Sequence, residues 1–109
     1  MNREEIRQKI EEFNLKSETV SIDEWNTEVV VKELKGKDYI EVSELSVTGT
    51  KVDKSRFIQE ALLRSVYTTE GELLFTEKDR ETVSNLPASI YLKLLNAVNK
   101  VNGIDNPKN

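Results

Sequence analysis

The longest amphipathic segment of the chain, between Pro87 and Gly103, constrains its fold more than any other feature. Pro87 fits the first turn of a helix, and Gly103 supplies the left-handed residue that stops one. The apolar side chains between them recur at helical spacing along one face: Ile90, Leu94, Ala97, Val98 and Val101. This face either packs into the chain's own core or serves a partner or a second copy.

The hydrophobic period changes in the first third of the chain. Val20 and Ile22 alternate with polar neighbours, and residues 28–34 contain a run of three valines. Alternation and β-branched residues both favour strands. We therefore predict a β-hairpin whose connection, residues 23–27, holds the only tryptophan, Trp25.

Helical spacing recurs in four further segments. The sequence predicts a short first helix over about residues 3–14, a second from Asp38 to about Leu45, a central one after Asp53 that includes Val66, and a fourth from Thr76 to about Asn85. The first helix offers only a narrow apolar stripe, because its remaining positions are mostly charged. Residues 46–51 are predicted as a loop, and residues 68–71 as a turn followed by an extended apolar segment, residues 73–75.

These elements predict an α+β fold, mainly helical, in a single domain with a small N-terminal β-hairpin. The 109 residues suffice for one modest core and not for two. We divide the chain into an N-terminal amphipathic helix (1–16), the main domain (17–103) and a polar tail (104–109).

The composition argues against several classes of function. The chain has no Cys and no His, which removes thiolate chemistry, disulfides and the commonest general base and metal ligand. Its net charge of −4 does not suit contact with a phosphate backbone. No stretch has the roughly 20 apolar residues of a membrane span. We expect a cytoplasmic protein that is not an enzyme and uses no cofactor, metal, small-molecule substrate, membrane or nucleic acid.

Three candidate sites have plainer explanations. A calcium loop centred on Gly71 would place Glu77 at its last ligand position, but Val66 and Thr68 would occupy positions that need carboxylates. Adjacent acids such as Glu4 and Glu5 point apart on a helix, as solvated surface acids do. A mild basic cluster is explained by the solvated face of the central helix: Lys51, Lys54, Arg56 and Arg64.

The residues that remain as functional candidates are protein contacts. Trp25 and Tyr39 are either partner contacts or part of the core, and aromatic side chains are common interface anchors. The apolar face of the last helix is the second candidate surface: Ile90, Leu94, Val98 and Val101.

The order of features from Asp23 onward resembles the tail assembly chaperones of long-tailed phages. The resemblance rests on Trp25 before a β-rich segment that ends in Lys32-Glu33-Leu34, and on the C-terminal half. There, residues 61–67 (ALLRSVY) lead into an acidic glycine turn and a Phe-Thr helix start, residues 69–79 (TEGELLFTEKD). A last helix closes on residues 94–103 (LLNAVNKVNG).

The chain departs from the family pattern at Asn26, where Gly is common, at Thr68 and Thr69, where acids are common, and at Val101, where Leu is usual. Asn tolerates turn geometry and Val keeps the helix apolar, so the architecture is unaffected. The departures leave the subfamily and the details of the partner open.

The resemblance implies binding and not catalysis. Members of the family bind the phage tape measure protein and keep it soluble before the tail tube polymerises, and they often form homo-oligomers. The expected place of action is the host cytoplasm. Two alternatives stay open: a small structural tail or head–tail connector protein of the virion, and an acidic regulatory binding protein.

Overall fold

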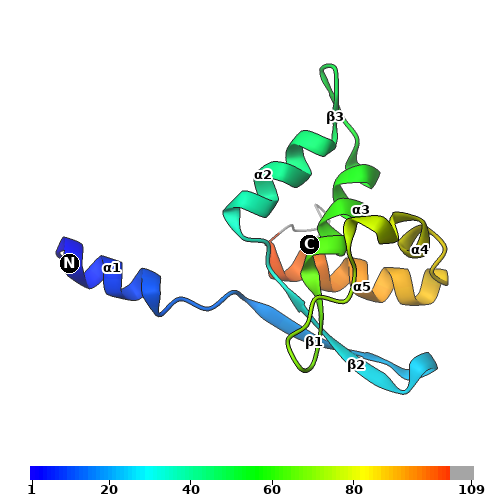
Figure 1. Cartoon of the computed structure of the whole chain (residues 1–109), viewed down its shortest axis with the longest axis horizontal. Coiled ribbons are helices and arrows are strands. Elements are labelled where there is room, and N and C mark those ends of the chain that lie inside the picture. The colour runs from blue at the N-terminus through cyan, green and yellow to red at the C-terminus, as the bar shows by residue number, and fades with distance from the viewer. Residues whose placement is uncertain (104–109) are drawn as a thin grey trace.

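The computed structural model describes residues 1–103. The predicted polar tail, residues 104–109, lies outside these residues. The described chain is α+β, as predicted: five α-helices, a three-stranded sheet, a two-stranded ribbon and two short 3₁₀ helices occur between residues 1 and 103 (Figure 1).

The first helix, α1 (Arg3–Glu11), stands away from the rest of the chain (Figure 1). Its N-terminus carries the predicted capping box, in which the Asn2 side chain accepts from the Glu5 backbone N–H at 2.9 Å and the Glu5 carboxylate accepts from the Asn2 N–H at 3.3 Å. None of the residues of α1 is buried. The helix is therefore held by its own cap and not by packing.

The predicted hairpin is confirmed. Strands β1 (Ser17–Ile22) and β2 (Thr27–Lys32) pair antiparallel, with Val20 opposite Val29. The 3₁₀ helix η1 (Asp23–Trp25) connects them, and Asn26 closes the turn in the left-handed conformation at φ 50°. Asn reaches this region more easily than most residues, because its short polar side chain suits it.

A third strand, β5 (Val66–Thr68), completes the sheet in the order β1-β2-β5. The expectation that Val66 continues the central helix is wrong. Helix α3 (Lys54–Ser65) ends one residue earlier, and Val66 pairs with Val31 of the sheet. Val66 is buried in the strand. An apolar residue at this position also fits the buried face of a helix, so the apolar pattern of the sequence did not distinguish the two conformations.

The segment after β5 turns back as predicted. Gly71 adopts φ 89° in the turn, and Leu73 lies opposite Tyr67 in an isolated antiparallel bridge. The Leu74 N–H donates to the Val66 carbonyl at 2.9 Å. This return strand partly covers the outer edge of β5.

Helix α2 (Gly36–Leu45) packs against α3 in an antiparallel pair. Residues 46–51, expected to be a plain loop, instead contribute to a two-stranded ribbon of β3 (Val47–Thr48) and β4 (Lys51–Val52) (Figure 1). Gly49, at φ 65°, allows the tight turn between them. The two paired residues on each side are too few to give a visible strand period in the sequence.

The C-terminal part follows the prediction. Thr76 caps η2 (Glu77–Asp79) and α4 (Arg80–Ser84), and α5 (Ala88–Val101) follows Pro87. Gly103 takes the left-handed conformation at φ 68° after the helix. The side chain of Asn102 accepts from the Leu34 N–H at 2.9 Å, which ties the end of α5 to the segment after β2.

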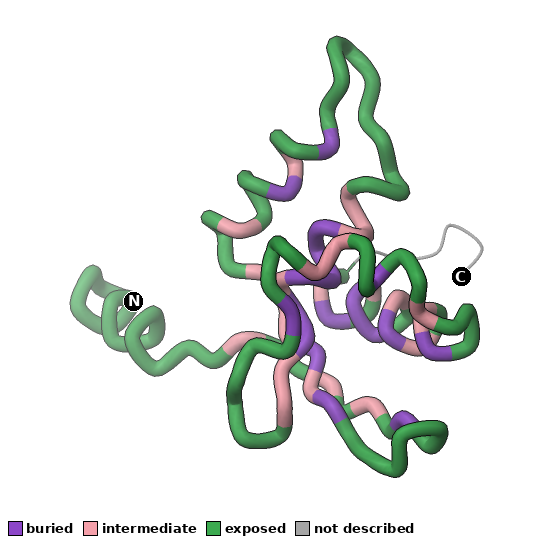
Figure 2. The backbone as a smooth tube through the Cα atoms, turned by 45° about the vertical axis from the view of Figure 1, so that its right-hand side comes forward, coloured by how far each residue is buried: buried purple, intermediate pink, exposed green. Residues whose placement is uncertain are grey.

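The core lies where α5 and α3 cover one face of the sheet (Figure 2). Helix α5 contacts β1 and β2, while α3 contacts α2, α4 and α5. The buried apolar residues come from all of these elements: Ile22, Val29, Val31, Val42, Ala61, Leu62, Leu63, Val66, Phe75, Val83, Ile90, Leu94, Ala97, Val98 and Val101.

Candidate functional site

The predicted aromatic contacts are exposed but far apart. Trp25 lies at the tip of the hairpin with 43% of its surface exposed, and Tyr39 lies on α2 with 54% exposed. These two places lie at opposite ends of β2 (Figure 1). Tyr39 also makes an edge-to-face contact with Phe57, their ring centroids 5.8 Å apart. The structure thus offers two separate aromatic contact points.

The predicted contact face of the last helix lies inside the core. Ile90, Leu94, Val98 and Val101 are all buried, because this face of α5 packs against the sheet and α3. A partner could reach these four side chains only if α5 left the core. The exposed apolar residue of this helix is Leu92, on its opposite face.

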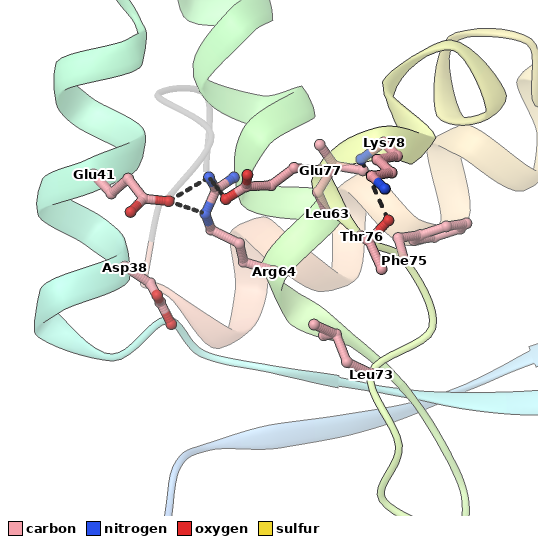
Figure 3. Close-up of a pocket in the computed structure, with 9 residues that line it drawn as sticks. All are labelled: Asp38, Glu41, Leu63, Arg64, Leu73, Phe75, Thr76, Glu77 and Lys78. Carbon is pink, nitrogen blue, oxygen red and sulfur yellow. Dashed lines mark hydrogen bonds and ion pairs between the residues drawn. The ribbon is translucent and has the colours of Figure 1, made fainter.

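An open groove of about 570 Å³ lies between α2, the end of α3 and residues 73–78 (Figure 3). Its apolar lining comes from Leu63, Leu73 and Phe75. Carboxylates and cations border this lining: Asp38, Glu41, Arg64, Glu77 and Lys78, together with the hydroxyl of Thr76. We call this feature the acidic groove, since its carboxylates outnumber its cations.

Arg64 crosses the acidic groove and links its two walls (Figure 3). Its guanidinium donates to Glu41 on α2 and lies 3.4 Å from Glu77 on the opposite wall. Burial by itself would lower the pKa of Arg64, but hydrogen bonds to Glu41 and Glu60 outweigh it and raise the pKa. The cation is therefore kept in its charged form and bridges α2 and η2.

Glu60 holds the Arg64 side chain in position through a buried ion pair. Its carboxylate is fully buried and accepts from Arg80 at 2.6 and 2.8 Å and from Arg64 at 3.0 Å. The hydrogen bonds from Arg80 lower the pKa of Glu60, against the opposing effect of burial and with further help from Arg64. The ionised carboxylate joins α3 to Arg80 at the start of α4, directly after η2, whose residues Glu77 and Lys78 border the acidic groove.

The stripe on α1 is the second uncovered apolar surface. Ile6 and Ile10 on α1 are exposed by 47% and 69%, and Phe13, two residues beyond the end of the helix, extends the stripe and is exposed by 63%. At 100° per residue, the three basic residues Arg3, Arg7 and Lys9 border this stripe. The four acids lie on the opposite half of the helix: Glu4, Glu5, Glu11 and Glu12. The apolar side of α1 is thus locally basic, although the helix as a whole is acidic.

The sequence predicted the conformation of one wall of the acidic groove but not the groove itself. Residues 73–75 were predicted as an extended apolar segment, and this segment forms one wall of the groove. Its partner wall comes from α2 and the end of α3, which lie about ten or more residues away in sequence. Only the packing of these elements could show that the two walls face one another.

The acidic groove is a surface feature of the described residues without a candidate metal centre. Between residues 1 and 103, no group of three or more His, Cys, Asp or Glu side chains is placed to hold a metal ion. Within the same range, no helix is both long enough and apolar enough to cross a membrane. An apolar floor with a polar border is typical of a site that binds a protein segment.

Comparison with known proteins gives a structural likeness. No protein-family model and no curated protein matches the sequence. Among solved structures, the chain is similar to the structure of the bacteriophage HK97 tail assembly chaperone, with a TM-score of 0.61 and 15% sequence identity. The match covers 89% of this chain and 97% of the HK97 chain. The two chains therefore share their fold over nearly their whole length.

Proposed function

We propose that this chain is a phage tail assembly chaperone, which binds the tape measure protein and keeps it soluble before the tail tube polymerises. The fold shared with the HK97 tail assembly chaperone carries the proposal. It covers 97% of the HK97 chain, so the likeness extends to nearly the whole of that protein chain and is not confined to one part of it. The sequence features from Trp25 to Gly103 support it independently of the fold.

The exposed apolar side chains suit such a role. Trp25 at the hairpin tip, and Tyr39 with its neighbour Ile40 on α2, are each at least 43% exposed. A tape measure protein made of long amphipathic helices would present apolar stripes, and exposed aromatic and aliphatic side chains cover such stripes. We propose these three residues as contacts, with several copies of the chain acting together in the host cytoplasm.

Co-expression with a tape measure fragment tests this function. The wild-type chain is expected to keep the fragment in the soluble fraction and to bind it in calorimetry. Trp25→Ala and Tyr39→Ala should each weaken binding about tenfold, as truncation of an aromatic anchor commonly does. Leu92→Ala is the control, because Leu92 is also exposed, at 52%, but lies on another face.

The proposal fails if the fragment stays insoluble and no binding heat is measured with the folded wild-type chain. Mass spectrometry of mature particles supplies a second criterion. A chaperone should be absent from them, whereas a stoichiometric amount of the chain in the particle would favour a structural tail or connector protein.

A further inference from the structure

We propose that α1 of one copy docks its apolar stripe into the acidic groove of a second copy. The inference deepens the proposed function, since it names a surface through which copies would associate. It rests on three observations: α1 is uncovered, the acidic groove is uncovered, and the charges around the two surfaces are opposite.

Helix α1 requires a cover to be stable. An isolated helix shorter than about 12 residues is marginal in water, even with good propensity, because nucleation is costly. Helix α1 has nine residues, and its capping box satisfies only its first turn. The apolar side chains Ile6 and Ile10 are exposed, and Phe13, which borders a pocket with Lys32 and Tyr67, is still 63% exposed.

The acidic groove matches α1 in chemistry. Leu73, 47% exposed, offers apolar contact to the stripe, and it lies over Leu63 and Phe75, which are buried in the core. On its border, Asp38 has no ion-pair partner within the described part of the chain, while Glu41 and Glu77 share the single cation Arg64.

Arg3, Arg7 and Lys9 border the stripe of α1 and supply the opposite charge. The four glutamates of α1 would face solvent, away from the carboxylates of the acidic groove. Two border residues, Arg64 and Lys78, carry charges that oppose this docking. Arg64 is paired with Glu41 and Glu77, and the long flexible side chain of Lys78 can turn outward.

The short segment between α1 and the rest of the chain favours docking of α1 into the groove of a second copy over docking into the groove of its own chain. Lys16 is fixed to the sheet, because its N–H donates to the Glu33 carboxylate at 2.7 Å and its carbonyl accepts from the Glu33 N–H at 2.8 Å. Three residues lie between the helix cap Glu12 and Lys16, so these two positions can be at most about 14 Å apart. This short tether carries α1 away from α2 and α3, which border the groove (Figures 1 and 2).

The mass of the purified full-length chain, measured by light scattering over a range of concentrations, tests the docking. We expect concentration-dependent association in the wild type. Ile10→Asp should weaken it at least tenfold by placing a charge in the stripe. Gln8→Asp is the matched control, since it makes the same change in charge on the opposite side of α1 and should leave association unchanged. Circular dichroism checks that both variants are folded.

Disulfide trapping identifies the contact itself. The chain has no cysteine, so single substitutions give an unambiguous background. A mixture of the Ile10→Cys and Leu73→Cys chains should form mixed disulfides faster than either chain alone forms homodimers. The matched control replaces Ile10→Cys with Gln8→Cys and should show no such preference.

The docking would be overturned by a wild type that is monomeric at every concentration, or by equal association of the Ile10→Asp and Gln8→Asp variants. It would also be overturned if a chain with both Ile10→Cys and Leu73→Cys formed its disulfide within one molecule at high dilution. These measurements use the purified chain alone. Their failure is therefore distinguishable from a failure to bind the tape measure fragment.

Discussion

At the scale of single residues, Glu60 has the largest influence on the neighbourhood of the acidic groove. It is a fully buried carboxylate that contacts three arginines, Arg56 and Arg64 on its own helix and Arg80 on α4. A buried ion pair is costly to break from one side, because the remaining charges lose their partner. The position is therefore important for the geometry of the groove as well as for stability.

Glu60→Gln should lower the free energy of unfolding by about 2–3 kcal/mol. This is less than the roughly 3–5 kcal/mol of a fully buried pair, because the Arg80 side chain is 39% exposed and can be solvated. Urea unfolding at pH 7 measures the change. Glu41→Gln is the control: Glu41 also contacts Arg64 but is exposed, so its loss should cost less than about 1 kcal/mol.

The lowered pKa of Glu60 predicts that the stability of the fold depends on pH. The pKa of Glu60 is lower in the folded chain than in the unfolded chain, so its stabilisation is fully present above the ordinary glutamate pKa of about 4.3. It is lost as the pH falls from there through the folded pKa. The difference in stability between wild type and Glu60→Gln should therefore shrink below about pH 4. A difference that stays constant down to pH 3 would contradict the assignment of the lowered pKa to Glu60.

At the scale of elements, α5 is the main packing element of the fold, and α1 packs against nothing. The two helices have similar sequence signatures, with apolar residues on one face. They differ in what covers that face: the sheet and α3 cover α5, whereas the stripe of α1 is open. Amphipathicity alone shows that a helix needs a cover and does not identify the cover.

A pair of substitutions on α5 measures this packing. Leu94→Ala should destabilise the fold by about 2–5 kcal/mol, because Leu94 is completely buried and its removal leaves a cavity. Leu92→Ala, two residues away on the exposed face, should change stability by less than about 0.5 kcal/mol. Thermal unfolding of both variants gives the comparison. Equal effects would mean that α5 is rotated about its axis relative to this structure.

At the scale of the whole molecule, the chain is a packed body with a helical arm. The described residues extend over 49 × 41 × 33 Å, and α1 lies at one extremity (Figure 1). The body contains the entire buried core. Such an arrangement separates folding, which depends on the body, from association, which we assign to the arm.

Removal of residues 2–12 should therefore leave the stability of the body unchanged. We expect a shift in Tm of less than about 2 °C, since α1 buries no side chain. Calorimetry should be performed at a concentration at which the wild type is monomeric, because association stabilises by mass action. A drop of more than about 5 °C under these conditions would show that α1 packs against its own body.

The sequence by itself determined most of the local structure. It identified the hairpin from its alternation, the C-terminal helix from its apolar spacing, and the turns at Gly71 and Gly103 from residues that tolerate positive φ. These features depend on interactions within a few residues, so the pattern of side chains is sufficient to predict them.

Tertiary structure decided the rest. Val66 lies in a strand because it pairs with Val31. The apolar face around Leu94 belongs to the core because the sheet and α3 cover it. The acidic groove exists only because α2 and residues 73–78 lie on either side of Arg64. Each of these outcomes depends on contacts between segments far apart in the chain, whose energies no local pattern contains.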